Sequence, residues 1–152
     1  MLIFSINIKL SNWFFKEHYP IKLSMQQTSI VGTYLLKAFL IESPEGIASD
    51  WGQGAHGLLI YAPTGHMSVS INKTIEHDPS QSESENAFDS ILFYSGTYSV
   101  DGGLIRHQVT QASNSSRIGK EMLRYCEWRG NELHLKTPKE AFGVATLIWI
   151  KL

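Results

Sequence analysis

The sequence contains a single cysteine, Cys126, so no disulfide can form within the chain. A protein that uses no disulfide is typical of a reducing compartment, and we therefore expect a cytoplasmic protein. The chain also lacks an excess of either charge, because 13 basic and 14 acidic residues give a net charge of −1. This balance provides no electrostatic basis for binding nucleic acid or an anionic membrane surface.

The amino-terminal segment has no features of a membrane anchor or a signal peptide. Residues 1–8 are apolar, but they are far fewer than the roughly 20 residues that span a bilayer. No basic residue precedes them and no small-residue cleavage pattern follows, so we expect neither a membrane span nor a signal peptide. Residues 1–27 are then either an extension that packs on the domain or the product of a start placed too early. The second interpretation is favoured, because Met25 leads directly into the first clear strand.

The rest of the chain, residues 28–152, is predicted to be one domain rich in β-strands. A chain of 152 residues that is 43% hydrophobic and 18% charged is long and apolar enough to bury a core. Alternating apolar and polar residues, separated by turn residues, predict about eight strands. These are residues 30–42, 57–62, 66–72, 94–101, 104–111, 120–129, 132–137 and 144–152.

Short connections between successive strands favour an all-β fold, an antiparallel up-and-down barrel. The last strand is so apolar that it needs neighbours on both sides, which favours a closed barrel over an open sandwich. One helix is expected around residues 80–90, where Ser82 and Glu85 have the spacing of a capping box. This helix could plug one end of the sheet.

Turn chemistry predicts how the central strands pair. A turn at Gly102 and Gly103 places Tyr98 opposite His107. A symmetrical loop before the next strand would place His107 opposite Arg124. These three residues would then form a polar row on a face that is otherwise apolar.

Two other turns give further registers. A turn at Gly130 and Asn131 pairs Trp128 with Leu133, and a loop over residues 62–65 would pair Tyr61 with His66.

The polar row has two interpretations. No Asp or Glu on these strands shares its face, and a buried guanidinium without a partner is costly. Arg124 could bond to backbone carbonyls or to Tyr98, leaving His107 as an ordinary core histidine. Alternatively, the row lines a cavity and binds a carboxylate, enolate or phenolate. The apolar walls of that cavity would come from Ile105, Val109, Met122 and Trp128.

Metal and cofactor sites are not expected. His56, His66 and His77 do not combine metal-ligand spacing with a common face, so we predict no metal site and no cofactor. Cys126 lies on the predicted inner face, where a small core residue is a simpler interpretation than a nucleophile.

Several short motifs, in order and spacing, resemble the lipocalin-like domain family, relatives of the calycin barrels found in bacterial and fungal proteins. They comprise residues 30–34 (Ile-Val-Gly-Thr-Tyr), 57–61, 63–67, 94–98, 101–102 and 119–133. The family usually has tryptophan where this chain has Tyr34, whose hydroxyl would need a partner. The resemblance implies an antiparallel barrel with a central pocket and, by analogy, binding of small apolar molecules.

The leading hypothesis is therefore a binding protein for a small hydrophobic or amphipathic molecule with an acidic head group. The alternative is a cofactor-free isomerase or cyclase, in which His107 moves a proton, Arg124 stabilises an enolate and Tyr98 positions it. A third possibility is a barrel whose interior is filled by side chains. Oligomeric state cannot be predicted from these patterns.

Overall fold

The computed structural model of the chain describes residues 29–75 and 77–152. Both interpretations of residues 1–27 therefore concern a segment outside the described residues, and the domain boundary near residue 28 stays a prediction. Within the described residues, no helix is both long enough and apolar enough to cross a membrane.

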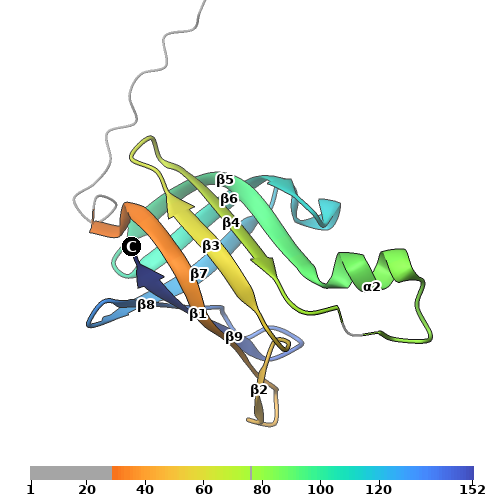
Figure 1. Cartoon of the computed structure of the whole chain (residues 1–152). Coiled ribbons are helices and arrows are strands. Elements are labelled where there is room, and N and C mark those ends of the chain that lie inside the picture. The colour runs from red at the N-terminus through yellow and green to blue at the C-terminus, as the bar shows by residue number, and fades with distance from the viewer. Residues whose placement is uncertain (1–28, 76) are drawn as a thin grey trace, which may run out of the picture.

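Nine antiparallel strands form a single sheet, in the order β2-β1-β3-β4-β5-β6-β7-β8-β9 (Figure 1). Their bounds are β1 Gly32–Glu42, β2 Ala48–Asp50, β3 His56–Tyr61, β4 His66–Asn72, β5 Ile91–Asp101, β6 Leu104–Ala112, β7 Glu121–Arg129, β8 Glu132–Lys136 and β9 Val144–Lys151. A 3-10 turn, η1 Ser115–Arg117, lies between β6 and β7, and the helix α2 Glu83–Asp89 precedes β5.

Pairing of β1 with β9 closes eight of these strands into a barrel. The pairs run from Tyr34 and Lys151 to Glu42 and Val144, with one irregularity between Leu36 and Ala38. The apolar β9 thus has β8 on one side and β1 on the other, as its composition requires. The predicted antiparallel up-and-down barrel is confirmed.

Strand β2 was not predicted from the sequence. It has three residues, all exposed, and pairs only with the end of β1. Such a short strand shows no alternation from which a strand could be predicted.

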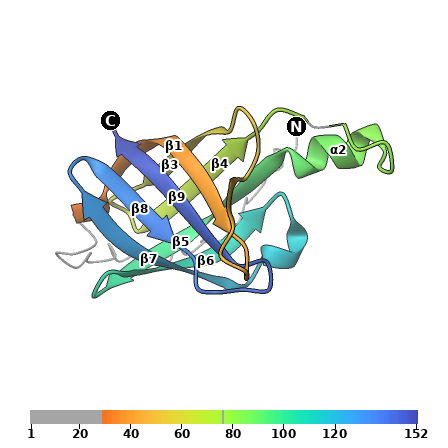
Figure 2. The same ribbon diagram turned by 90° about the horizontal axis from the view of Figure 1, so that it is seen from below.

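The predicted helix is confirmed, but its expected position is wrong. Ser82 caps α2 and Glu85 completes the capping box, as the spacing indicates. The helix does not plug the barrel: both views show α2 projecting away from the strands (Figures 1 and 2). Phe88, at the end of the helix, is 47% exposed, so little apolar area is available to hold α2 against an opening.

The hairpin registers were predicted with mixed success. Tyr98 pairs with His107, and Trp128 with Leu133, as expected. The register of β3 and β4 is wrong by one residue: Tyr61 pairs with Met67. The reason is that Ala62 still donates to the carbonyl of His66, at 2.8 Å, which leaves a three-residue loop.

The predicted register of β6 and β7 is wrong by two residues. Arg124 pairs with Ile105 and His107 with Met122, because the loop that contains η1 is not symmetrical. A shift of two residues preserves the face, so both His107 and Arg124 still point inward.

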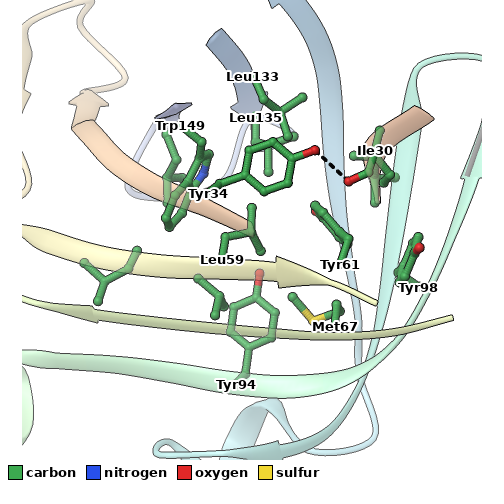
Figure 3. Packing of buried hydrophobic residues seen from close by; sticks show 14 of the residues in the cluster. Ile30, Tyr34, Leu59, Tyr61, Met67, Tyr94, Tyr98, Leu133, Leu135 and Trp149 are labelled. Atoms are coloured by element: carbon green, nitrogen blue, oxygen red, sulfur yellow. Dashed lines mark hydrogen bonds between the residues drawn. The ribbon is translucent and has the colours of Figure 1, made fainter. Parts of the chain in front are cut away.

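Aromatic side chains fill one end of the barrel, which we call the closed end (Figure 3). Tyr34 is fully buried and donates to the carbonyl of Ile30 at 2.6 Å, which gives its hydroxyl the partner it needs. Its ring lies edge-on to Tyr61, with ring centroids 6.2 Å apart. The ring centroids of Tyr61 and Tyr98 are 4.8 Å apart. The rest of the interior is available for a cavity.

Candidate functional site

A cavity of about 590 Å³ occupies the half of the barrel opposite the closed end. Its volume lies in the range of about 300–1,000 Å³ that is usual for small-molecule sites. Most of its wall is apolar, with Phe39, Leu59, Val69, Met122, Leu135 and Leu147 among the lining residues. The third sequence hypothesis, an interior filled by side chains, describes only the closed end.

The cavity opens among loops that carry polar and charged side chains. Arg117 and Lys120 come from the connection between β6 and β7, and Glu140 from the connection between β8 and β9. Trp51 forms another part of this rim and stacks on Phe39 with ring centroids 4.9 Å apart. The site therefore has an apolar interior and a polar rim.

Arg124 is the charged residue in the cavity wall that is itself buried. It is 8% exposed, its Nη1 donates to the carbonyl of Leu123 at 2.7 Å, and its Nη2 donates to the hydroxyl of Tyr94 at 3.4 Å. None of the ion pairs among the described residues involves Arg124. An arginine is protonated at all relevant pH values, so the wall contains a positive charge without a counterion.

His107 lies beside this charge and is held between two tyrosines. Its Nε2 is 2.7 Å from the hydroxyl of Tyr61, and its Nδ1 is 3.0 Å from the hydroxyl of Tyr94. Burial, together with the charge of Arg124, lowers the pKa of His107 to about 3, so the imidazole is neutral at pH 7. Burial likewise raises the pKa of Tyr61 well above 10, so its hydroxyl keeps its proton.

The direction of these hydrogen bonds follows from the burial of Tyr61. Its hydroxyl has no other partner among the described residues, so its proton is satisfied only by donation to Nε2 of His107. A neutral imidazole that accepts at Nε2 carries its proton on Nδ1 and donates it to Tyr94. Tyr94 then accepts from both His107 and Arg124, and its own proton is left for a partner in the cavity.

Trp149 on β9 carries a further buried donor. This residue lines the cavity and is 1% exposed, and its Nε1–H has no hydrogen-bond partner among the described residues. Unpaired buried donors are uncommon in proteins. Two groups of the wall are thus available as donors to a bound molecule: the guanidinium of Arg124 and the hydroxyl of Tyr94.

The structure separates the site residues predicted from the sequence into two groups. His107, Arg124 and Met122 line the cavity. The remaining four are not among its lining residues: Tyr98, Ile105, Val109 and Trp128. Tyr98, Ile105 and Val109 are buried, and the Tyr98 hydroxyl donates to the carbonyl of Ala62 at 3.0 Å. Trp128 is 39% exposed and packs beside Tyr34 at the closed end.

Tyr94, Tyr61 and Trp149 were missed. Alternation does place Tyr94 on the same face as Tyr98, four residues later on β5, so its inward direction could have been inferred. Tyr61 reaches His107 from β3, across the interior of the barrel, and no hairpin register contains such a contact.

The described residues contain no group of three His, Cys, Asp or Glu side chains that could hold a metal ion. Cys126 is half-buried, and burial raises the pKa of its thiol, which disfavours the nucleophilic thiolate.

Comparison with known proteins settles the family. The family model of the lipocalin-like domain matches residues 31–151. The chain belongs to the lipocalin-like domain family. The resemblance inferred from short motifs is thereby confirmed, over a span that includes all nine strands and the cavity. No curated protein matches the sequence of this lipocalin-like chain.

Solved structures of low sequence identity also match the lipocalin-like chain. A redesigned β-barrel is 8% identical, with a TM-score of 0.47 over 83% of this chain and 94% of its own. A de novo designed fluorescence-activating β-barrel is 11% identical, with a TM-score of 0.44, and the match covers 86% of this chain and 100% of the designed one. Fatty-acid-binding protein 1 of Echinococcus granulosus is 12% identical, with a TM-score of 0.39, and the match covers 82% of this chain and 98% of that protein.

Proposed function

We propose that this lipocalin-like chain binds a small amphipathic molecule with an acidic head group inside its barrel. The observation that carries the proposal is Arg124, a buried cation in the cavity wall that has no counterion among the described residues. An anionic head group beside it would supply that counterion and accept charge-assisted hydrogen bonds.

The neighbouring donors support an acceptor as the head group. The proton of Tyr94 and the Nε1–H of Trp149 have no acceptor within the described protein. A carboxylate, enolate or phenolate oxygen can accept a hydrogen bond from such a donor, whereas an ammonium group cannot. The apolar walls would surround the rest of the ligand.

Replacing Arg124 tests this proposal. We expect Arg124→Met to weaken the binding of a medium-chain alkyl carboxylate by roughly 10- to 100-fold, because a hydrogen bond to a charged group contributes about 1.5–3 kcal/mol. The primary alcohol of the same chain length should lose much less affinity. Fluorescence titration can follow both ligands, since Trp149 and Trp51 line the cavity.

Arg129→Met is the matched control. Arg129 lies on β7, the strand of Arg124, but it is exposed and pairs with Glu127 at 3.0 Å, and neither residue lines the cavity. This variant should bind both ligands as the unchanged protein does. Equal weakening of the carboxylate and the alcohol by Arg124→Met would overturn the assignment of Arg124 to the acidic head group.

The isomerase or cyclase hypothesis requires His107 to act as a proton-transferring base. To move a proton, its ring would have to release one of two tyrosine hydrogen bonds and act as a base with a pKa of about 3. Binding is therefore the function that we propose, and catalysis stays a prediction. Turnover of a bound carbonyl compound that is lost in His107→Gln, with binding retained, would support catalysis instead.

A further inference from the structure

Two further cations line the opening of the cavity. Arg117 ends the 3-10 turn η1 and Lys120 directly precedes β7, so both come from the connection between β6 and β7. Neither residue takes part in an ion pair within residues 29–75 and 77–152. The cavity therefore has cations at two levels: Arg124 in its wall, and Arg117 with Lys120 at its opening, which we call the rim pair.

Backbone hydrogen bonds hold the rim pair in place. The N–H of Lys120 donates to the carbonyl of Arg117 at 3.1 Å, and the carbonyl of Lys120 accepts from the N–H of Val109 at 3.0 Å. The backbone N–H of Arg117 in turn donates to the carbonyl of Asn114 at 3.1 Å. These bonds fix the points from which both long side chains start, so less order has to be imposed when they contact a ligand.

Strand geometry separates the two levels of charge. Lys120, Met122 and Arg124 are alternate residues and all three line the cavity, so they form a row from the opening into the interior. Four residues of extended chain separate Lys120 from Arg124, a rise of about 13 Å. Met122 lies in the middle of the row, so the path between the two cations is apolar there.

The acidic residues at the opening leave the positive charge in excess. Glu121 also lines the cavity, but its carboxylate pairs with Arg106 at 3.0 Å. Glu140, on the connection between β8 and β9, is the other carboxylate of the lining, and it has no cationic partner among the described residues. The two cations of the rim pair are thus opposed by one uncompensated carboxylate. This excess favours an anionic group at the opening over a cationic one.

We propose that the ligand carries a second acidic group, which the rim pair binds at the opening while Arg124 binds the first group inside. This inference rests on the proposed function and narrows its ligand to an amphiphile that is anionic at both ends. Each residue contributes three backbone bonds to the distance between Lys120 and Arg124, so an alkyl chain of about 10–12 carbons spans it. α,ω-Dicarboxylates of this length are the simplest molecules of the class.

Calorimetric titration of the full chain with three ligands of one length tests this inference. Dodecanedioate, 12-hydroxydodecanoate and 12-aminododecanoate differ in the end group at the opening, which is anionic, neutral or cationic. We expect dodecanedioate to bind most tightly and 12-aminododecanoate least tightly. The double substitution Arg117→Met and Lys120→Met should lower the preference for dodecanedioate over 12-hydroxydodecanoate by about three- to fivefold, the size expected of exposed ion pairs. The change in this ratio is the readout, because the two equivalent ends of a diacid favour it statistically in every variant.

Lys139→Met is the matched control, because Lys139 is exposed between β8 and β9 and does not line the cavity. This variant should leave the ratio unchanged.

Arg124→Met distinguishes failure of this inference from failure of the proposed function. It should weaken dodecanedioate and 12-hydroxydodecanoate alike. If it does so while the double variant leaves their ratio unchanged, only the second acidic group is wrong. Ligands whose affinity does not depend on Arg124 would overturn the proposed function as well. Tighter binding of 12-aminododecanoate than of 12-hydroxydodecanoate would also overturn the inference, since Glu140 would then determine the charge preference at the opening.

Discussion

His107 shows how burial decides the chemistry of a single residue. The imidazole contacts tyrosine hydroxyls at both ring nitrogens and lies near the positive charge of Arg124. Both burial and this charge disfavour the protonated ring. The neutral ring can therefore transmit a fixed hydrogen-bond direction from Tyr61 to Tyr94, which leaves the Tyr94 proton available to the cavity.

This environment predicts a specific dependence of stability on pH. The pKa of His107 is about 3 in the folded chain and near 6.5 when unfolded. The unfolded state binds more protons between these values, so the free energy of unfolding should fall as the pH drops below 6.5. The slope attributable to His107 is at most about 1.4 kcal/mol per pH unit.

Urea unfolding between pH 7 and pH 5 measures this effect, because most carboxylates stay ionised in that window. In His107→Gln the free energy of unfolding should decrease less between pH 7 and pH 5 than it does in the unchanged protein. His134→Gln, at an outward-facing histidine that contacts Glu132, is the control and should leave the decrease in place. An identical pH dependence in His107→Gln would contradict the account of the buried ring.

For single residues, the sequence predicted which side chains point into the barrel but not which side chains they contact. Alternation correctly placed His107 and Arg124 inward, and the absence of acidic residues on their face correctly indicated an unpaired charge. One interpretation expected Arg124 to bond to backbone carbonyls or to Tyr98: it does donate to the carbonyl of Leu123, but the side chain that it contacts is Tyr94. The lengths and tilts of long side chains decide such contacts, and strand patterns do not contain them.

Among the elements, the pairing of β5 with β6 contains the irregularity beside the site, and the extra residue is Thr110 of β6. The register shifts between Ser95 and Gly96, directly after Tyr94. A glycine is required there, because a Cβ atom at residue 96 would lie 1.9 Å from the carbonyl oxygen of Gln108. The absence of a side chain at Gly96 therefore allows the two backbones to approach closely, two residues from the tyrosine that faces the cavity.

Gly96→Ala should accordingly destabilise the fold by about 2 kcal/mol or more, since neither backbone can move without breaking sheet hydrogen bonds. Ser99→Ala, at an exposed position on the same strand, should change stability by less than about 0.5 kcal/mol. Chemical denaturation of both variants measures the difference. Equal stability of the two variants would show that the close approach at residue 96 relaxes without cost.

The elements themselves could be predicted from the sequence wherever turn chemistry was explicit. The turns at residues 102–103 and 130–131 gave correct registers because positive-φ glycines define two-residue loops. Registers across residues 62–65 and 113–120 were wrong because longer loops divide their residues unevenly between the strands. The short β2 and the bulge at Thr110 depend on tertiary pairing, which local patterns do not record.

The whole molecule divides into a filled end and a hollow end. Tyr34, Tyr61 and Tyr98 occupy the closed end, whereas the opposite half holds the cavity. Barrel closure was predictable, because the apolar final strand needs two neighbours. The division of the interior was not, since it depends on how the side chains pack together.

The central claim is that Arg124 and Tyr94 hold an ionised head group inside the barrel. The most direct measurement is the ¹³C chemical shift of a carboxyl-labelled medium-chain acid bound to the full chain, followed from pH 7 to pH 5. We predict that the bound carboxyl stays ionised throughout this range, because a nearby guanidinium favours the charged form. In Arg124→Met the same buried carboxyl should begin to take up a proton within the range. A carboxyl that already protonates in the unchanged protein, with the same profile in Arg124→Met, would contradict the account.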